Sequence, residues 1–491
     1  MSRTAAMDHD AIVVGTGYGG ATTAAVLARA GLRVGILERG TWWGAFGGHR
    51  PLPETLPQVM RALEGLNLSA FGRSVRIPLC RRGLLEVHLH GTTFLMMNAV
   101  AVGGTSLVNG ALMQRPAGTF FDALPPELTA AELEPRYRAV EQALAVAPGP
   151  PDEGNGQILA ALAGDRKWKL TQAPQAIRWK SDDASRPACT RCNRCIVGCN
   201  AGAKQSLDLT FIPRARDAGA ALQDLCAVQT VEPIEGGYAV RFRNVRTRHT
   251  ELWRTPRVVL AAGTLNTQKI LFRSSVAGSL GKIGGLGQYT SLGADLLDFY
   301  PVPRDVGPSV IDGHCTDWVL EVPDAVGDRE FAFGMLTPPV LPGSSLLRRA
   351  QGRRTLSLIG FGRDAMDARV VWHGQGIRLH HEAQAVIRRI AAAMDRTAEA
   401  YGWDKPHRRH DSAQPKRSWM SVHPMGGCRM ASDASRGVVD SKGEVFGHPG
   451  LHIADASVFA SAPAAGPALS IAALSWWIAE RIAEEAGRAG A

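Results

Sequence analysis

The run Asp10-Ala-Ile-Val-Val-Gly15-Thr-Gly17-Tyr18-Gly19-Gly20 decides the fold of this chain. It has the pattern of a buried strand that turns into a helix through three glycines in G-x-G-x-x-G spacing. Gly15 allows the tight turn, Gly17 lets the backbone approach a pyrophosphate, and Gly20 lets the helix pack closely on the sheet. The run therefore predicts an α/β domain of Rossmann type, with a dinucleotide pyrophosphate at the positive N-terminus of its first helix.

The residues that follow complete the predicted dinucleotide site. A helix of small residues is expected over 21–30 and a second buried strand over 32–37, with Glu38 at its end. An acid at that place accepts hydrogen bonds from a ribose hydroxyl. The adjoining Tyr18, Gly19 and Arg39 are assigned to the same site. Further strands are expected over 225–234 and 258–263. The glycine motif alone does not separate FAD from NAD.

Composition and charge narrow the class of protein. The chain has 491 residues, of which 45% are apolar and 20% charged, as is ordinary for a globular protein of two or three domains. The net charge of +10 comes without a run of basic residues and without a nucleic-acid-binding motif, so no nucleic-acid partner is expected. Neither a signal peptide nor a stretch of about eighteen apolar residues is found, which predicts a cytoplasmic protein without an integral membrane segment.

The C-terminal part carries a second motif. It reads Ser421-Val-His-Pro-Met-Gly-Gly-Cys-Arg-Met430, followed by Leu451-His-Ile-Ala-Asp-Ala-Ser457 and by Gly466-Pro467. These segments resemble the C-terminal signature of the glucose-methanol-choline (GMC) oxidoreductases, FAD enzymes that oxidise alcohols. The resemblance implies that His423 faces the flavin and accepts the hydroxyl proton as hydride passes to flavin N5. Family members place a second polar residue, Asn or His, before the later proline, and this chain has Gly466 there.

The resemblance extends to the rest of the cofactor site. The run Val102-Gly103-Gly104-Thr-Ser106-Leu-Val-Asn109-Gly110 resembles the segment that lies beneath the flavin, where glycine lets the main chain lie flat against a planar ring. A helix beginning at Ala468 is expected to direct its N-terminal amides toward the flavin. The resemblance implies an FAD site made of Gly15, Gly17, Tyr18, Gly19, Gly20, Glu38, Arg39, Gly103, Gly104, Ser106, Asn109, Gly110, Val228, Ala262, Gly263, Asp455, Ala456 and Pro467.

Four cysteines form a compact run, Cys189-x-x-Cys192-x-x-Cys195-x-x-x-Cys199. The spacing is that of a bacterial ferredoxin ligand run and is too compressed for a two-plus-two zinc site. It predicts a 4Fe–4S or 3Fe–4S cluster, with Cys199 or the distant Cys226 as the fourth ligand. Such a cluster would pass flavin electrons to an acceptor protein or a quinone and make the protein a dehydrogenase. The alternatives are reduced structural cysteines or a local disulfide.

The segment from about 286 to 415 changes pattern. Short alternating runs over 318–323, 331–336, 356–361 and 368–372 predict an antiparallel sheet, and 382–401 predicts a helix. We therefore expect an FAD-binding domain over 1–290 and 416–491, with a cysteine-rich insertion around 180–210, and a substrate domain over 291–415. Glu321 resembles the position of an active-site Glu in cholesterol-oxidase-like members, and its alternative is an exposed strand residue.

The expected function is an FAD-dependent dehydrogenation of an alcohol or related carbon centre of an apolar small molecule. Gly466 leaves three interpretations open. Another residue such as Glu321 supplies the missing contact, the pocket is enlarged, or the reaction differs. The different reaction would be C–H dehydrogenation next to a carbonyl. A separate alternative to the expected function is a catalytically weakened flavoprotein that serves as an electron-transfer subunit.

Overall fold

The structure is a computed structural model of the whole chain. It describes residues 6–43, 52–53, 58, 61–70, 73–80, 82–90, 94–150, 159–160, 163, 168–181, 186–192, 194–301, 318–336, 355–374, 376–380, 385–400 and 419–489. The predicted domain boundary between residues 415 and 416 lies outside these ranges.

A five-stranded parallel sheet forms the centre of the dinucleotide-binding part. Its order is β10-β2-β1-β14-β24. The strands are β1 (Ala11–Val14), β2 (Val34–Leu37), β10 (Ala221–Gln223), β14 (Val258–Leu260) and β24 (Leu451–Ile453). Strands β1, β2, β14 and β24 are buried at every position, as expected for a parallel sheet that is covered on both faces. The predicted Rossmann-like architecture is confirmed, including the return of the chain to this sheet near its C-terminal end.

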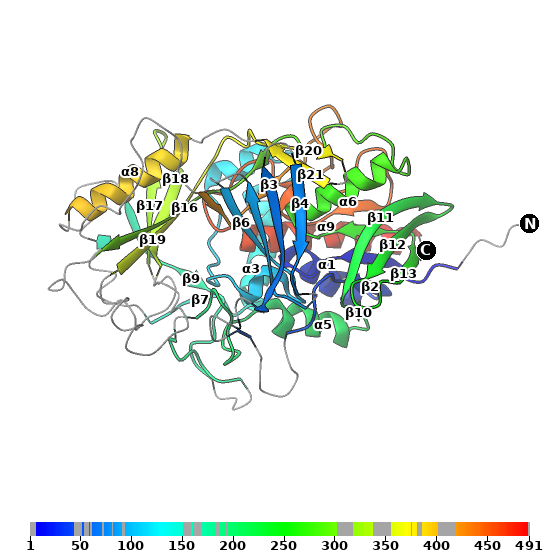
Figure 1. The fold of residues 1–491 in the computed structure, drawn as a ribbon, viewed down its shortest axis with the longest axis horizontal. Coiled ribbons are helices and arrows are strands. Elements are labelled where there is room, and N and C mark those ends of the chain that lie inside the picture. Colours follow the sequence, from blue (N-terminus) through cyan, green and yellow to red (C-terminus); the bar gives the residue numbers. More distant parts are fainter. Residues whose placement is uncertain are drawn as a thin grey trace, which may run out of the picture.

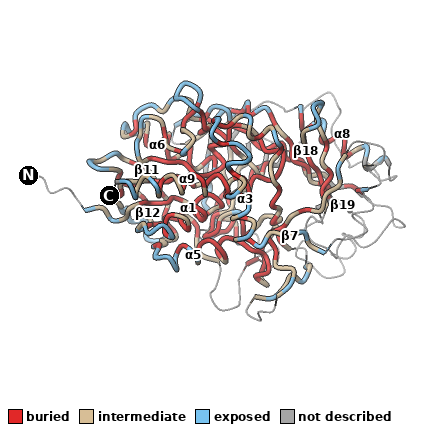
Figure 2. Tube along the Cα trace, turned by 180° about the vertical axis from the view of Figure 1, so that it is seen from behind, coloured by how far each residue is buried: buried red, intermediate tan, exposed pale blue. Residues whose placement is uncertain are grey.

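Helices pack around this sheet. Helix α1 (Tyr18–Arg29) contacts both α5 (Phe211–Asp217) and the long α9 (Ala468–Ala489), and α3 (Ala130–Ala143) packs on α9. In Figure 2 the buried residues concentrate in α1, α3, α9 and the chain between them. Helix α6 (Thr264–Val276) packs on an antiparallel sheet of β11 (Cys226–Ile234), β12 (Gly237–Asn244) and β13 (Thr250–Thr255). The helix predicted from Ala468 is therefore present, and it is a central part of the core.

A mixed sheet of five strands lies in front of the parallel sheet in Figure 1. Its order is β22-β6-β5-β3-β4. The strands are β3 (Leu63–Ala70), β4 (Arg73–Pro78), β5 (Leu85–His90), β6 (Phe94–Ala99) and β22 (Trp419–Ser421). Strand β22 ends two residues before His423 and pairs in parallel with β6. The start of the HP motif is thereby fixed to a segment more than three hundred residues earlier in the sequence.

The third large sheet is antiparallel, with the order β16-β19-β18-β17-β8. Its strands are β8 (Lys169–Gln172), β16 (Ala294–Pro301), β17 (Trp318–Pro323), β18 (Arg329–Leu336) and β19 (Thr355–Gly362). Helix α8 (Ala385–Ala400) contacts β16, β18 and β19. The expected strands over 318–323, 331–336 and 356–361 are confirmed. The expected strand near 368–372 lies instead in a separate hairpin of β20 (Arg369–His373) and β21 (Gly376–His380), and β8 comes from the range that we assigned to the FAD-binding domain.

Short elements connect these sheets. They are β7 (Ala147–Pro148), β9 (Pro174–Gln175), β15 (Thr290–Ser291), β23 (Met425–Gly426), and the 3₁₀ helices η1 (Gly104–Leu107), η2 (Gly118–Ala123), η3 (Leu207–Leu209) and η4 (Ala456–Val458). The pairing of β15 with β23 brings the HP motif beside the start of β16. No helix in the described ranges is long and apolar enough to cross a membrane.

Candidate flavin and substrate site

A cavity of about 650 Å³ lies where the three large sheets meet. The parallel sheet contributes residues at the carboxyl ends of its strands, the usual ligand-binding edge of such sheets. The mixed sheet contributes Met97 and Ala99, and the antiparallel sheet contributes Leu297, Ile359 and Phe361. The predicted residues that line the cavity are Gly15, Gly17, Tyr18, Gly19, Glu38, Arg39, Gly104, Asn109, Gly110, Val228, Ala262, Gly263, His423, Asp455, Ala456, Gly466 and Pro467.

The glycine motif divides into a surface for the ligand and a packing contact. A Cβ atom added at Gly17 would meet no atom within 4 Å, so this backbone is open to the cavity. A Cβ at Gly20 would lie 2.0 Å from the Gly15 carbonyl oxygen, so Gly20 is needed for the close packing of α1 on the preceding turn. Gly20 is not among the lining residues. The close packing agrees with the role predicted for Gly20, and the contact of Gly17 with a pyrophosphate stays a prediction.

Glu38 is buried at the edge of the cavity. Its Oε2 accepts hydrogen bonds from the Thr16 backbone N–H (3.0 Å) and hydroxyl (2.6 Å), and its Oε1 accepts from Gly40 N–H (2.7 Å). Burial raises the pKa of this carboxyl. These bonds fix the orientation of Glu38 beside the glycine turn, and its predicted contact with a ribose hydroxyl stays a prediction.

The segment expected beneath the flavin is held by polar side chains. Asn109 Nδ2 donates to the Tyr18 hydroxyl (2.9 Å), which ties the segment to α1. Gly103 N–H donates to Thr16 Oγ1 (3.0 Å), and Ser106 Oγ donates to the Gly103 carbonyl oxygen (2.7 Å). Gly103 and Ser106 thus support the segment without lining the cavity.

The buried ammonium of Lys204 joins this segment to the cysteine run, a role that the sequence analysis missed. Its Nζ donates to the carbonyl oxygens of Leu107 (2.8 Å), Asn109 (2.9 Å) and Cys195 (2.7 Å). A fully buried cation that donates hydrogen bonds to three carbonyl oxygens is a strong local constraint on the backbone. The only sequence signal for it was the Gly-Ala-Lys run after the cysteines.

Asp455 connects two walls of the cavity. Its Oδ2 accepts from Gly263 N–H (2.9 Å) and Thr267 Oγ1 (2.6 Å), and its Oδ1 accepts from Ser457 N–H (2.9 Å) and Oγ (2.6 Å). Burial raises the pKa of this carboxyl too. Four donors from the protein hold the carboxylate, so Asp455 fixes the segment after β14 to η4 within the expected FAD site.

His423 lies in the cavity wall with a carboxylate behind it. Its Nδ1 is 2.8 Å from Asp295 Oδ1, and Asp295 Oδ2 accepts from the backbone N–H groups of Val422 (2.9 Å) and His423 (3.1 Å). Only 3% of the Asp295 side chain is exposed. The Phe361 ring meets the imidazole edge to face, with 6.0 Å between ring centroids. Asp295 was not predicted, because nothing in the sequence of β16, which also contains Asp298, distinguishes it from an ordinary strand carboxylate.

Gly466 also lines the cavity, and no atom of the described residues lies within 4 Å of the position that its Cβ would take. No described side chain therefore takes the place of the missing one. This geometry agrees with two of the three interpretations of Gly466, an enlarged pocket and a different reaction.

Glu321 is placed away from this site. Its Oε1 accepts a hydrogen bond from Arg329 Nη1 (3.0 Å) on the neighbouring strand β18. It is not one of the described residues that line the cavity. The structure does not bring Glu321 together with His423, because the side chain is engaged in an ion pair within the antiparallel sheet.

The four cysteines surround a separate cavity of about 10 Å³, the size of a single water molecule. Backbone N–H groups of Arg191 and Lys204 donate to Cys189 Sγ and Cys199 Sγ, both at 3.4 Å. Within the described ranges, no group of three or more Cys, His, Asp or Glu side chains is arranged to hold a metal ion. The donor set for the predicted iron–sulfur cluster is therefore not found among the described residues.

A Rossmann-type dinucleotide site covered by a second sheet, with a histidine facing the cavity, defines a class of flavin-binding fold. Comparison with known proteins agrees. Two sequence models of the GMC oxidoreductase family match residues 9–298 and 353–475. The chain belongs to the GMC oxidoreductase family.

Relatives match over nearly the whole chain. A protein of Mycobacterium tuberculosis described as an uncharacterized GMC-type oxidoreductase is 28% identical over 96% of this chain and 75% of its own length. A cholesterol oxidase of the same species is 25% identical, over 95% of this chain and 89% of its own. A long-chain-alcohol oxidase of Arabidopsis thaliana is 24% identical, over 97% of this chain and 67% of its own.

Solved structures show the same fold. Pyridoxine 4-oxidase from Mesorbium loti superimposes with a TM-score of 0.64 and 16% identity, over 96% of this chain and 98% of its own. A formate oxidase of Aspergillus oryzae, studied for its FAD modification, superimposes with a TM-score of 0.69 and 14% identity, over 98% and 99%. The cofactor of the family is FAD, and the open Gly17 backbone at the N-terminus of α1 fits a pyrophosphate.

Proposed function

We propose that this protein is an FAD-dependent oxidoreductase that dehydrogenates the CH–OH group of a lipophilic small molecule, with His423 as the base. The observation that carries the proposal is the position of His423 in a cavity whose other wall is apolar, formed by Leu297, Ile359 and Phe361. The names of two relatives, a cholesterol oxidase and a long-chain-alcohol oxidase, support a lipophilic alcohol as the substrate class.

The proposed reaction assigns a separate role to each part of the cavity. Bound FAD supplies the hydride acceptor. His423 accepts the hydroxyl proton of the substrate at Nε2, because its Nδ1 is bonded to Asp295. The apolar wall binds the carbon skeleton and keeps water from the reacting carbon. The cofactor is held by the α1 N-terminus, Glu38 and the 103–110 segment. The FAD-binding part of the chain consists of residues 1–290 and 416–491. The substrate part consists of residues 291–415 together with strand β8.

Gly466 favours a second candidate reaction. Dehydrogenation of a C–H bond next to a carbonyl needs one base, and one histidine lines the described cavity. A panel that contains primary alcohols, secondary alcohols and cyclic ketones separates the two reactions. Bleaching of the flavin by alcohols supports the first, and bleaching only by ketones supports the second.

The test is anaerobic stopped-flow reduction of the bound flavin, followed through its visible absorbance. With wild-type protein, a lipophilic alcohol should bleach the flavin. His423→Gln should slow this step by roughly 10²- to 10⁴-fold, the range that a general base contributes, while FAD content stays the same. Equal rates in H423Q and wild type would remove His423 from the reaction, and absence of bleaching by the whole panel would refute the proposed activity.

The electron acceptor is measured in the second half of the same experiment. Reduced protein is mixed with dissolved oxygen or with a quinone, and the return of flavin absorbance is timed. Reoxidation by oxygen at the rate of turnover would make the protein an oxidase, as its named relatives are. Reoxidation only by the quinone or by an acceptor protein would make it the dehydrogenase predicted from the cysteine run.

A further inference from the structure

The geometry points to Asp295 as the residue that fixes the tautomer of His423 and so allows one histidine to act as base without a second polar partner. The inference rests on the proposed function. It concerns a positioning residue, because Asp295 acts through His423 and does not line the cavity among the described residues.

The tautomer follows from the hydrogen bond between the two side chains. A carboxylate oxygen can only accept, so the 2.8 Å contact between Asp295 Oδ1 and His423 Nδ1 requires the hydrogen on Nδ1. A neutral imidazole that carries its hydrogen on Nδ1 has its lone pair on Nε2. His423 therefore offers a proton-accepting nitrogen on the side of the ring away from Asp295.

The same carboxylate fixes the backbone of the HP motif. Asp295 Oδ2 accepts from the N–H groups of Val422 and His423, so ring and main chain of His423 are bound to one buried group. The close approach depends on Gly293, which has a φ of +66°. A Cβ there would lie 2.8 Å from the His423 carbonyl oxygen and 2.9 Å from Asp295 Oδ2. The chain is thus built to hold Asp295 against His423.

Other described residues of the cavity do not offer an equivalent base. His423 is the only histidine among the described residues that line it. The Glu38 and Asp455 carboxylates receive three and four hydrogen bonds from the protein itself. Gly466 supplies no side chain. Control of the His423 tautomer is then the means by which this site orients its base.

The experiment uses FAD-loaded protein labelled with ¹⁵N-histidine and reads the tautomer from the nitrogen chemical shifts, without substrate. The His423 signals are assigned by their loss in His423→Gln. In wild type we expect Nδ1 protonated and Nε2 unprotonated. Asp295→Asn keeps the size of the side chain, and its oxygen can still accept the two backbone N–H groups. Its NH₂ then faces Nδ1, so the hydrogen should move to Nε2.

Kinetics provide the second measurement. In D295N the rate of flavin reduction at saturating alcohol should fall by roughly 10³- to 10⁴-fold, as the wrong histidine tautomer does in serine proteases, with little change in the half-saturating substrate concentration. Asp295→Glu, which keeps a carboxylate, should retain the wild-type tautomer. Asp440→Asn is the control. Asp440 is a partly buried carboxylate that accepts from the backbone N–H groups of Lys442 and Glu444 and is not among the described residues that line the cavity, so this variant should keep both tautomer and rate.

Two results would overturn the inference. One is a wild-type spectrum with the hydrogen on Nε2, which decides the question even if D295N does not fold. The other is a folded D295N protein with the wild-type tautomer or the wild-type rate. Failure of the proposed function is distinguishable: if no alcohol or ketone reduces the wild-type flavin, the activity is refuted, while the nitrogen shifts still report on Asp295.

Discussion

At the scale of single residues, the site combines a strongly held base with an open position. His423 is bonded through its ring and its backbone to one carboxylate. Gly466, on the same cavity, has free space where a side chain would stand. A rigid base beside unfilled space is suited to a reacting carbon that carries more than one bulky substituent. The proposed substrates are accordingly secondary alcohols as well as primary ones.

Substitution at Gly466 tests this interpretation of the open position. Gly466→Ala and Gly466→Asn should both fold, because the added Cβ meets no atom of the described residues within 4 Å, and flavin absorbance checks that each variant retains FAD. The Asn side chain should fill the space and lower the ratio of kcat/KM for bulky secondary alcohols over primary alcohols, by roughly 10- to 100-fold. Ala should change the ratio much less and is the control for the loss of glycine. An unchanged ratio in G466N would show that substrate does not use this space.

At the scale of elements, strand β24 carries a buried histidine with a consequence for stability. His452 is 2% exposed, its Nδ1 has no hydrogen-bond partner among the described residues, and its Nε2 is 3.9 Å from Glu444 Oε1. Burial lowers the pKa of His452 to about 4. The folded protein therefore keeps this histidine neutral while the unfolded chain binds a proton at a higher pH.

The sign of the pH effect follows from this lowered pKa. Above the unfolded pKa of about 6.5, His452 is neutral in both states and does not reduce the free energy of unfolding. As the pH falls from there toward about 4, only the unfolded state binds the proton, so the free energy of unfolding decreases. His452→Leu should reduce the loss of unfolding free energy over this range by up to about 3 kcal/mol. Denaturant titrations at several pH values measure it. His249→Leu, at an exposed position, should leave the acid dependence unchanged, and an equal dependence in H452L and wild type would contradict the prediction.

The helices and strands that the sequence predicted correctly are those whose apolar residues form a recognisable pattern. Strand β1 is a continuous apolar run, helix α9 carries apolar residues at helical spacing, and the runs over 318–323 and 331–336 are short apolar segments; all are found. The mixed sheet was not expected, because its strands carry buried acids. Glu86, on β5, is 3% exposed and pairs with Arg39 Nη2 at 2.6 Å. A buried acid departs from the alternation of buried apolar and exposed polar residues that predicts a strand. Its partner Arg39 lies far away in the sequence, so the ion pair could not be predicted.

The candidate site shows the same division. His423 and the glycines were predicted because a short motif contains them. Asp295 and Lys204 were missed because each acts through a contact with a segment about a hundred residues away. Glu321 was assigned by its apolar neighbours, and the structure pairs it with Arg329 instead. The spacing of the four cysteines predicted that they lie close together, and they do line one small cavity. The spacing alone does not decide whether they bind a metal.

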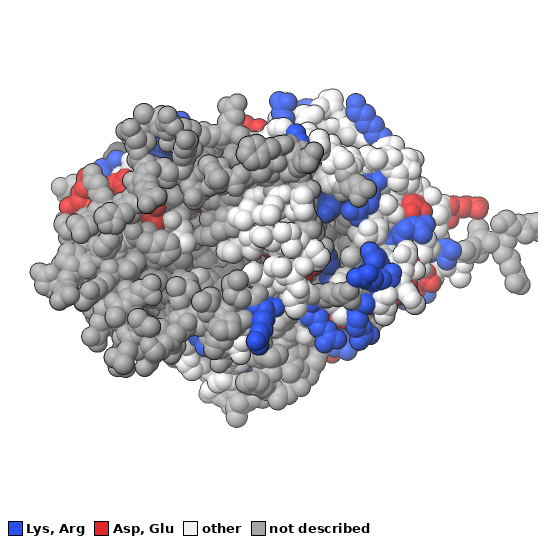
Figure 3. Space-filling model, in the orientation of Figure 1, with Lys and Arg blue, Asp and Glu red and all other residues white. Residues whose placement is uncertain are grey.

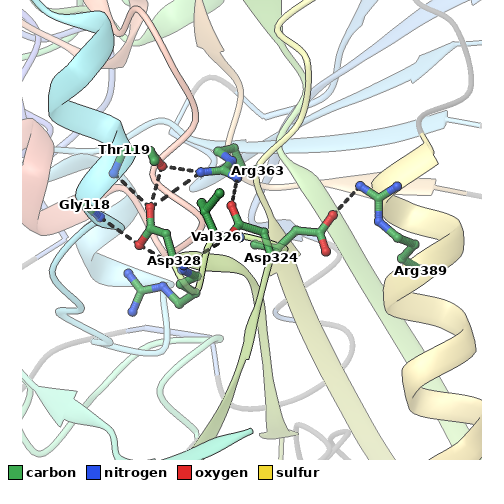
Figure 4. Close-up of polar contacts among 9 residues, drawn as sticks. Gly118, Thr119, Asp324, Val326, Asp328, Arg363 and Arg389 are labelled. Atoms are coloured by element: carbon green, nitrogen blue, oxygen red, sulfur yellow. Dashed lines mark hydrogen bonds and ion pairs between the residues drawn. The ribbon is translucent and has the colours of Figure 1, made fainter. Parts of the chain in front are cut away.

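At the scale of the whole molecule, the antiparallel sheet is fastened to the rest by a polar clasp of Gly118, Thr119, Asp324, Asp328 and Arg363 (Figure 4). Asp328 accepts from Gly118 N–H (3.1 Å), Thr119 N–H (2.9 Å) and Thr119 Oγ1 (2.6 Å). Arg363 Nη2 donates to Asp324 Oδ2 (2.6 Å). The clasp joins the β17–β18 turn to η2, and Ala117, just before η2, bonds to Pro463 in the loop that leads to Gly466.

The net charge of +10 is a property of the molecular surface as a whole. On the face drawn in Figure 3, Lys and Arg side chains are spread over the right-hand part, with some Asp and Glu among them, and the centre of the face is an uncharged area. This scattered pattern is that of a solvated surface. The proposed function rests on the cavity and on the contacts between the sheets.

The clasp should set how firmly the antiparallel sheet closes the cavity. Burial acts to raise the pKa of Asp328, but hydrogen bonds from the Thr119 side chain and backbone lower that pKa to about 2. The contribution of the ionised Asp328 carboxylate to the free energy of unfolding is thus present above about pH 4 and is lost as the pH falls toward 2. At neutral pH, Asp328→Asn should lower the free energy of unfolding by about 2 kcal/mol, the scale of hydrogen bonds to a charged group.

Hydrogen exchange locates the effect of this substitution. In D328N, amides of β17 and β18 should exchange faster, while those of β1 and β14 keep their protection, because the clasp holds one sheet and leaves the other intact. Asp433→Asn, an exposed turn carboxylate outside the clasp, should leave both sets unchanged. Faster exchange throughout the molecule would mean that the two sheets unfold as one unit. Unchanged exchange in β17 and β18 would mean that the apolar contacts alone hold the sheet over the cavity.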